Sequence, residues 1–280
     1  MSAAGGPSEA LRRGESAGCE VVQLFVKNNK QWFGKPFTSA AVDDYKTERA
    51  LHTFAAVFGH AGYLINLAAP AGPNRDNSIR SLIQEIQLAA QLEIPFLVLH
   101  PGAHLKAGEA AGIRQIAKGL NQVFRATRKL PVRIALENTA GPGTALGGKL
   151  EHHAAIYDQV DHPERLGLCL DTCHYFAAGY PIHTPKGWRA AIKEVEDLLG
   201  LHQILAFHLN DSKGGLGSHL DRHEHIGKGN IGADGFRHIV RDRRFAKTPA
   251  ALETPKSEDL HEDIENLRVL RQMAARGSRT

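Results

Sequence analysis

Short apolar runs recur along the chain, with room for a helix between one run and the next. Each run is bounded by Gly, Pro or polar residues, a pattern typical of parallel strands that are buried on both faces. We therefore predict seven β-strands, at Val21–Val26, Ala55–His60, Pro95–His100, Val132–Glu137, Leu166–Asp171, Ile204–His208 and Pro249–Glu253.

Longer segments between the runs space their apolar residues three or four apart, as amphipathic helices do. In Asn77–Leu92, for example, Ile79, Leu82 and Ile86 fall near one face. Thr184, before Pro185, and Ser257 are expected N-terminal caps. The predicted helices are Pro7–Ser16, Asn77–Leu92, Gly108–Lys129, Leu150–Val160, Thr184–Leu199, Ala233–Phe245 and Ser257–Ala275.

Repeated alternation of strand and helix, without a linker, predicts a parallel sheet with helices outside it. A chain of 280 residues suits one α/β domain of the TIM type, so we expect a single (β/α)8-like barrel over residues 1–280. Such a barrel begins with a strand, whereas the first element predicted here is the helix Pro7–Ser16. We therefore expect the first strand to be missing from this chain and the natural start to lie upstream of Met1.

Composition narrows the class of protein. With 42% hydrophobic and 23% charged residues, the chain is ordinary for a soluble globular protein. No apolar run approaches the roughly 20 residues that span a bilayer, and no secretory signal precedes Pro7, so we predict a cytoplasmic protein without a membrane partner. A net charge of +4 suits a polyanionic partner, although many metabolic enzymes share it.

Six of the seven runs end in a side chain that can bind a metal ion: His60, His100, Glu137, Asp171, His208 and Glu253. The carboxyl ends of barrel strands meet on one face, so these six side chains should converge. Burying so many acids and imidazoles together is costly unless cations compensate. Nitrogen and oxygen donors favour Zn²⁺, Mn²⁺ or Fe²⁺, and several such ions together suit phosphoester hydrolysis.

Two further stretches carry metal-binding residue types. Asp221 and His223 lie in a Gly-rich stretch, and in an extended segment they point to the same side. The stretch Asp171-Thr-Cys-His174 adds a thiol and an imidazole. Cys169 and Cys173 do not have the spacing of a zinc ribbon, so we expect both to pack as small apolar residues.

Longer motifs extend over nearly the whole chain: Ser2–Gly6, Phe25–Asn28 with Gln31–Trp32, Tyr63–Leu67, His100–His104, Leu136–Gly141, Leu170–His174 with Phe176–Tyr180, His208–Asp211, Asp221–His223, Gly227–Gly232 and Leu252–Thr254. In these motifs the sequence resembles endonuclease IV, the family of metal-dependent apurinic/apyrimidinic endonucleases of base-excision repair. The resemblance implies a TIM barrel. The family's first strand precedes the motif that here begins at Ser2, which agrees with the strand count.

The resemblance also implies a centre of three Zn²⁺ ions, with Mn²⁺ as an alternative in one or more sites. The first ion would be held by His60, His100 and Glu137, the second by Glu137 with Asp171, His208 and Glu253, and the third by His174, Asp221 and His223.

The activity implied is that of a deoxyribonuclease IV, a phosphodiester hydrolase that repairs DNA. It would cut duplex DNA on the 5′ side of an abasic site and leave a 3′-hydroxyl and a 5′-deoxyribose phosphate. In the family a metal-bound hydroxide attacks phosphorus. Glu137 would keep the first two ions close, and Glu253 would orient or deprotonate the nucleophile.

The partner implied is double-stranded DNA with an abasic site. We expect the protein itself to be a monomer. Lys30, Gln31 and Tyr63 stand where the family contacts the duplex. Better-known members have an arginine at the position of Lys30. Lysine keeps the charge but lacks the planar guanidinium, so we expect Lys30 to contact phosphate rather than to intercalate.

Two other functions fit parts of the pattern. A metal-dependent sugar isomerase or epimerase on a related barrel would need one or two ions, and the set His174, Asp221 and His223 argues against it. A non-catalytic protein that recognises damaged DNA would bind abasic sites without cutting them. A cleavage assay separates both from a nuclease.

Overall fold

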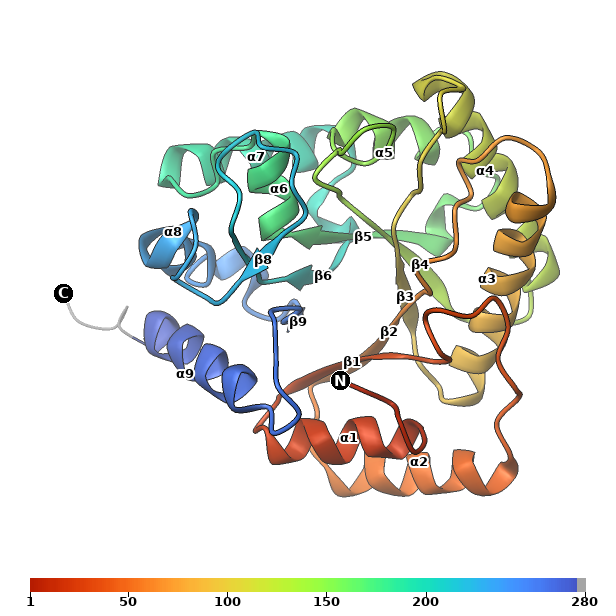
Figure 1. Cartoon of the computed structure of the whole chain (residues 1–280), viewed down its shortest axis with the longest axis horizontal. Helices are drawn as coiled ribbons and strands as arrows, with labels where there is room; N and C mark the ends of the chain where they lie inside the picture. The colour runs from red at the N-terminus through yellow and green to blue at the C-terminus, as the bar shows by residue number, and fades with distance from the viewer. Residues whose placement is uncertain (276–280) are drawn as a thin grey trace.

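A strongly curved sheet of parallel strands forms the centre of the molecule, as the computed structural model of residues 1–275 shows (Figure 1). Its strands follow the order β1-β2-β3-β4-β5-β6-β9, and each is parallel to its neighbour. They span β1 Val21–Phe25, β2 Ala56–His60, β3 Phe96–Leu99, β4 Arg133–Glu137, β5 Leu166–Asp171, β6 Ile204–His208 and β9 Ala250–Ala251. All seven predicted strands are confirmed, and so is the nearly closed barrel with fewer than eight strands.

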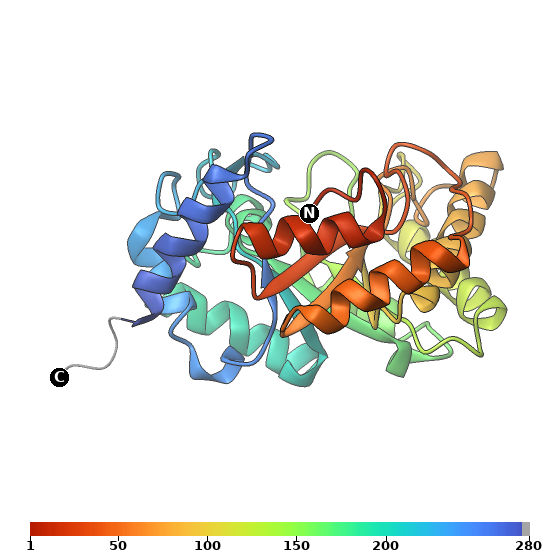
Figure 2. The ribbon, with the colours of Figure 1, turned by 90° about the horizontal axis from the view of Figure 1, so that it is seen from below.

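Helices surround the sheet on its outer face (Figures 1 and 2). Two of them, α1 and α2, lie side by side outside β1 in both views. The helices are α1 Pro7–Ser16, α2 Ser39–Leu51, α3 Pro73–Gln91, α4 Glu109–Ala126, α5 Leu150–Tyr157, α6 Thr172–Ala178, α7 Pro185–Leu198, α8 Gly232–Ile239 and α9 His261–Ala275. A small antiparallel pair, β7 Asp211–Ser212 and β8 His223–Glu224, stands apart from the barrel sheet.

Apolar side chains fill two separate regions of the core. One lies between sheet and helices, where Leu82 and Ile116 are fully buried on the inner faces of α3 and α4. The other is the interior of the barrel, a cluster of Phe58, Phe96, Val98, Ala135, Cys169, Ala206 and Ala251. The interior of the barrel is therefore packed rather than hollow.

Several predicted boundaries are wrong, for local reasons. The expected helix Ala233–Phe245 ends at Ile239, and a separate 3-10 turn, Arg243–Phe245, is capped by Asp242. Ser257 does not begin the last helix, because Leu260 has a φ of 61° that a helix cannot contain. The hydroxyl of Ser257 instead lies 2.7 Å from a carboxylate oxygen of Asp259 and 2.6 Å from one of Glu262.

Other sequence predictions of the helices are confirmed, and two helices, α2 and α6, are missing from them. Thr184 caps α7, since its hydroxyl accepts from the backbone N–H of Gly187 at 3.0 Å. No helix was expected between Val26 and Ala55, yet α2 lies there and is capped by Thr38. Within α2 only Tyr45 is fully buried, so its apolar periodicity is weak. No helix of the described residues is both long and apolar enough to cross a membrane.

A seam separates the two edges of the barrel sheet. In residues 1–275, β1 and β9 are the end strands and do not pair with each other. A groove of about 780 Å³ follows this seam and is lined by residues that include Val21, Gln23, Ala250 and Glu253. The amino group of Met1 donates a hydrogen bond to the carbonyl of Gln23, so the segment before α1 enters the groove beside β1.

Candidate metal centre

The predicted ligands gather at the carboxyl end of the barrel sheet. His60, Glu137, Asp171 and His208 are the last residues of β2, β4, β5 and β6, while His100 follows β3 and Glu253 follows β9 by two residues. Register pairs Asp171 directly with His208 on adjacent strands. The fold therefore brings six ligand-type residues together because each ends a parallel strand.

Glu137 lies at the centre of this group and is fully buried. Its Oε2 is 3.2 Å from Nε2 of His60 and 3.0 Å from Nε2 of His100. Its Oε1 is 3.0 Å from Nδ1 of His208. One carboxylate thus faces imidazoles of two neighbouring clusters with its two oxygens.

A second cluster consists of Glu137, Asp171, His208 and Glu253, whose donor atoms all lie within 4.8 Å of one another. The Nδ1 of His208 is 3.3 Å from Oε2 of Glu253 and 3.8 Å from Oδ2 of Asp171. Glu253 is the least buried of the four, at 19% exposure of its side chain. This carboxylate therefore stands on the solvent side of the cluster.

A third cluster contains Asp171, His174 and His223. Asp221 joins it, because its Oδ1 is 3.1 Å from Nε2 of His174 and 3.3 Å from Nε2 of His223. The carboxylate of Asp221 thus faces the imidazoles of both His174 and His223. Asp171 belongs to both the second and the third cluster, whereas the sequence assigned it to the second alone.

The protein's own hydrogen bonds leave two ring nitrogens of the third cluster unused. The Nε2 atoms of His174 and His223 are buried and have no hydrogen-bond partner of proper geometry. Buried imidazole nitrogens are normally satisfied, and these two point at the carboxylate of Asp221. The arrangement fits a cation between them, and five imidazoles with four carboxylates form a donor set that suits zinc.

Opposite charges in the cluster offset the effect of burial on its pKa values. Burial alone would raise the pKa of Glu137, but the imidazoles of His208, His100 and His174 hold it well below its usual range. Burial alone would lower the pKa of His223, yet the carboxylates of Asp171 and Asp221 raise it to about 9. Positive charge beside the buried carboxylates therefore favours their ionised form.

The cysteines of the stretch Asp171-Thr-Cys-His174 and its preceding strand do not join any cluster within residues 1–275. Cys173 is buried and its thiol donates to the carbonyl of Arg222 at 3.6 Å, while Cys169 packs inside the barrel. Burial raises the pKa of both thiols to about 12. Both are protonated thiols at neutral pH, which are poor metal ligands.

The three predicted DNA contacts lie at the rim of the cluster and the groove. Lys30 and Gln31 are exposed in the loop after β1, and Lys30 lines the groove beside Tyr63. Tyr63 is 57% exposed, with its ring 5.6 Å from that of His60 and in edge contact with Phe25. The structure thus places a large exposed aromatic side chain directly beside the first cluster.

Three amide side chains that the sequence did not single out support the proposed ligands. Asn138 accepts from the backbone N–H of Asp171 at 2.6 Å. Asn210 donates to Oδ2 of Asp171 at 2.6 Å and accepts from the N–H of Glu253 at 2.7 Å. Gln23 contacts His208 and Glu253. The available signal was their position: the two asparagines closely follow strand-end ligands, and Gln23 interrupts the apolar run Val21–Val26.

Comparisons with known proteins agree on one family. The family model described as "Xylose isomerase-like TIM barrel" matches residues 11–273. A protein of Chloroflexus aurantiacus named "Probable endonuclease 4" is 46% identical over 273 residues, which cover 98% of this chain and 96% of that protein. Its namesake in Geobacter sulfurreducens is 44% identical over 276 residues, covering 99% and 93%.

Two solved structures illustrate a near and a distant likeness. The crystal structure of endonuclease IV from Thermus thermophilus superposes with a TM-score of 0.87 at 31% identity, covering 99% of this chain and 98% of that one. A 3-keto-D-glucoside 4-epimerase of E. coli has a TM-score of 0.66 at 12% identity, covering 95% and 94%. The second likeness concerns the fold alone.

Proposed function

Because the chain belongs to the endonuclease IV family, we propose that it hydrolyses the phosphodiester on the 5′ side of an abasic site in duplex DNA. The products would be a 3′-hydroxyl and a 5′-deoxyribose phosphate. One observation carries the proposal: three ligand clusters adjoin one another and share Glu137 and Asp171. Such sharing suits three cations held close together at one phosphate.

Three Zn²⁺ ions would occupy these clusters, with Mn²⁺ as the alternative in one or more of them. His60, His100 and Glu137 would hold the first, and Asp171, His208 and Glu253 would complete the second together with Glu137. His174, Asp221 and His223 would hold the third. When bound, the ions would activate water and stabilise negative charge on the phosphoryl oxygens.

The residues of the chain would then perform distinct tasks. Glu253, on the solvent side of the second cluster, would orient the attacking water and accept its proton. Tyr63 presents an exposed aromatic face beside His60, where it would flank the flipped-out abasic nucleotide. Lys30 would contact a DNA phosphate from the rim of the groove.

The third cluster separates this proposal from a sugar isomerase. Proton or hydride shifts on a sugar need one or two ions, and His174, Asp221 and His223 would have no task there. The identity of 44–46% to proteins named endonuclease 4, over nearly the full chain, also favours the nuclease. No feature of the described residues favours the epimerase-like alternative.

A nicking assay tests the proposal. The zinc-loaded protein is incubated with a labelled duplex that holds one tetrahydrofuran abasic analogue, and with the same duplex without the analogue. We expect a single cut on the 5′ side of the analogue only. Tight binding without a cut, by folded and metal-loaded protein, would instead identify a damage-binding protein.

A further inference from the structure

Gln23 shows an unusual pair of contacts in the middle of β1. Its side chain is buried at 8% exposure and turns toward the metal cluster. We propose that Gln23 is a positioning residue, whose amide fixes the proton of His208 and one oxygen of Glu253 so that their other atoms face the second ion. This inference rests on the proposed metal centre.

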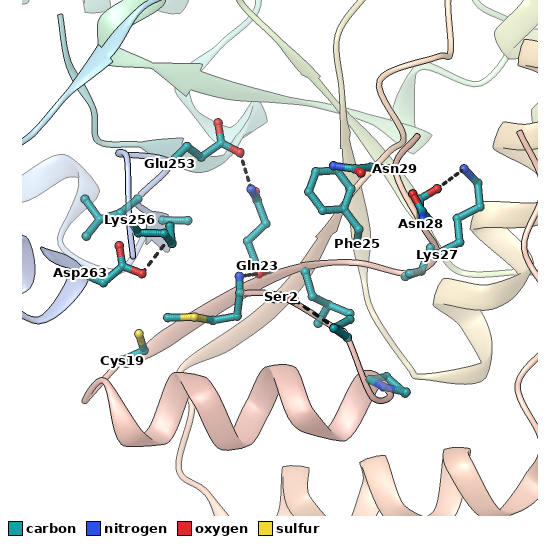
Figure 3. A pocket seen from close by; sticks show the side chains of 18 of the residues that line it. Ser2, Cys19, Gln23, Phe25, Lys27, Asn28, Asn29, Glu253, Lys256 and Asp263 are labelled. Atoms are coloured by element: carbon teal, nitrogen blue, oxygen red, sulfur yellow. Dashed lines mark hydrogen bonds and ion pairs between the residues drawn. The ribbon is translucent and has the colours of Figure 1, made fainter. Parts of the chain in front are cut away.

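Both ends of the amide are within hydrogen-bond distance of proposed ligands. The Nε2 of Gln23 donates to Oε1 of Glu253 at 2.7 Å, a contact that Figure 3 shows crossing from β1 to the segment after β9. The Oε1 of Gln23 is 2.7 Å from Nε2 of His208. A buried amide is costly unless both of its ends are bonded, and this one is.

The direction of these bonds follows from chemistry. An ionised Glu253 can only accept, so the amide must present its NH₂ group to the carboxylate. The amide oxygen then faces His208, and its Nε2 must carry a hydrogen. The lone pair of a neutral His208 is therefore on Nδ1, the atom that lies 3.0 Å from Glu137 and 3.3 Å from Glu253.

The group that fixes the tautomer of His208 differs from the groups that fix the tautomers of three other proposed ligands. His60 bonds the carbonyl of Ala61 through Nδ1 at 2.7 Å, and His174 bonds the carbonyl of Asn138 at 2.9 Å. His223 likewise bonds the carbonyl of Glu253 at 3.1 Å. Backbone carbonyls set these three tautomers, whereas a single side chain sets that of His208 and also holds Glu253. A substitution can therefore remove this one support while leaving the others intact.

Two substitutions separate the two contacts. Gln23→Met keeps the length of the side chain and removes both bonds. Gln23→Glu keeps an acceptor for His208 but loses the donor to Glu253. Gln203→Met is the matched control, because Gln203 is also partly buried and hydrogen-bonded but lies before the amino end of β6, opposite to His208.

Zinc binding and the His208 tautomer provide readouts apart from cleavage. Chelator competition should show that Gln23→Met binds one ion with 10–100-fold lower affinity. Its affinity for the other two ions should be unchanged, and the Gln203→Met control should bind all three ions as the wild type does. In zinc-loaded protein, ¹⁵N NMR should show His208 protonated at Nε2 in the wild type and in Gln23→Glu, but not uniformly in Gln23→Met. For cleavage, kcat should fall in both Gln23 variants while KM for the abasic duplex stays constant.

The outcomes distinguish failure of this inference from failure of the proposed function. If Gln23→Met binds all three ions as the wild type does and retains the His208 tautomer, Gln23 is only a structural residue. A tautomer in Gln23→Glu that matches Gln23→Met would refute the acceptor role. A wild type that binds zinc with these effects but does not cut DNA would leave the inference standing and remove the nuclease. A wild type that binds no zinc would remove both.

Discussion

At the scale of single residues, Asp171 performs a local task as well as its proposed metal-binding one. Its Oδ1 accepts from the N–H of His174 at 2.8 Å and so caps α6, while Oδ2 accepts from Asn210. An aspartate at a helix N-cap is stabilising by itself. This cap holds His174 at the start of its helix, which explains how two residues three apart reach the same cluster.

Glu253 is the residue whose loss should separate binding from chemistry. Glu253→Gln keeps the shape and the hydrogen bond from Gln23 but removes the negative charge that would accept a proton. We expect cleavage of the abasic duplex to fall at least about 100-fold, the scale of a lost general base, while binding remains measurable by fluorescence anisotropy.

The matched control for Glu253→Gln is Glu258→Gln, which changes an exposed acid a few residues away and should cut normally. Near-normal turnover of Glu253→Gln would show that this carboxylate is not the proton acceptor.

At the scale of elements, a buried ion pair joins two loops to α3. The Nζ of Lys27 is 2.9 Å from Glu85 and donates to the carbonyl of Gln31 at 2.6 Å. Glu85 in turn accepts from the N–H of Gly62 at 3.0 Å, next to Tyr63. The loop of Gln31 and the loop of Tyr63, which carry the proposed DNA contacts, are thus held by one pair.

Breaking this pair from one side should cost more than removing it altogether. Lys27→Met or Glu85→Gln leaves a buried group unsatisfied, so each should lower the free energy of unfolding by about 3 kcal/mol. The double variant should lose less than the sum of the two. Urea unfolding of the four proteins measures the coupling, and single variants within about 0.5 kcal/mol of the wild type would show that the pair contributes nothing.

The elements also show how far sequence reasoning extends. Strand positions could be predicted because buried parallel strands are continuous apolar runs, and the convergence of six proposed ligands could be predicted because they stand at the ends of those runs. The helix α2 could not be predicted in this way. It contacts α1 through charged residues such as Arg12 and Glu48 and has no clear apolar stripe. The role of Gln23 depends on a partner 230 residues away, and no local pattern reveals such a contact.

At the scale of the whole molecule, buried tyrosines should make the fold sensitive to alkali. Burial raises the pKa of Tyr45 to about 12, and it also raises the pKa of Tyr157, Tyr175 and Tyr180. Each phenol stays protonated in the folded state above about pH 10, where the unfolded chain ionises. Their contribution to stability is therefore complete below about pH 10 and is lost as the pH rises toward about 12.

Absorbance at 295 nm measures this directly. Native protein should show little phenolate at about pH 10.5, and the urea midpoint should fall steadily between about pH 9.5 and 11.5. If these tyrosines ionise in the native state as freely as in urea, burial does not protect them.

The proposed ions should also stabilise the fold as a whole, because the folded state alone assembles their ligands. We expect a chelator to lower the thermal unfolding midpoint by several degrees and added zinc to restore it. In Glu137→Gln, which lacks the carboxylate shared by two clusters, most of the zinc-dependent shift should disappear. An identical midpoint with and without zinc in the wild type would contradict this.

The proposed metal ligands lie on both sides of the seam between β1 and β9. The strands at its two sides do not pair within residues 1–275, and His60 and Glu253 approach the cluster from opposite sides of it. Ions bound in the cluster would act as a cross-link that closes the chain loop between these two residues, which is about two thirds of the protein. On the scale used for covalent cross-links, closing so long a loop removes about 5 kcal/mol of unfolded-state entropy. The proposed metal ions would thus also hold together the two unpaired edges of the barrel sheet.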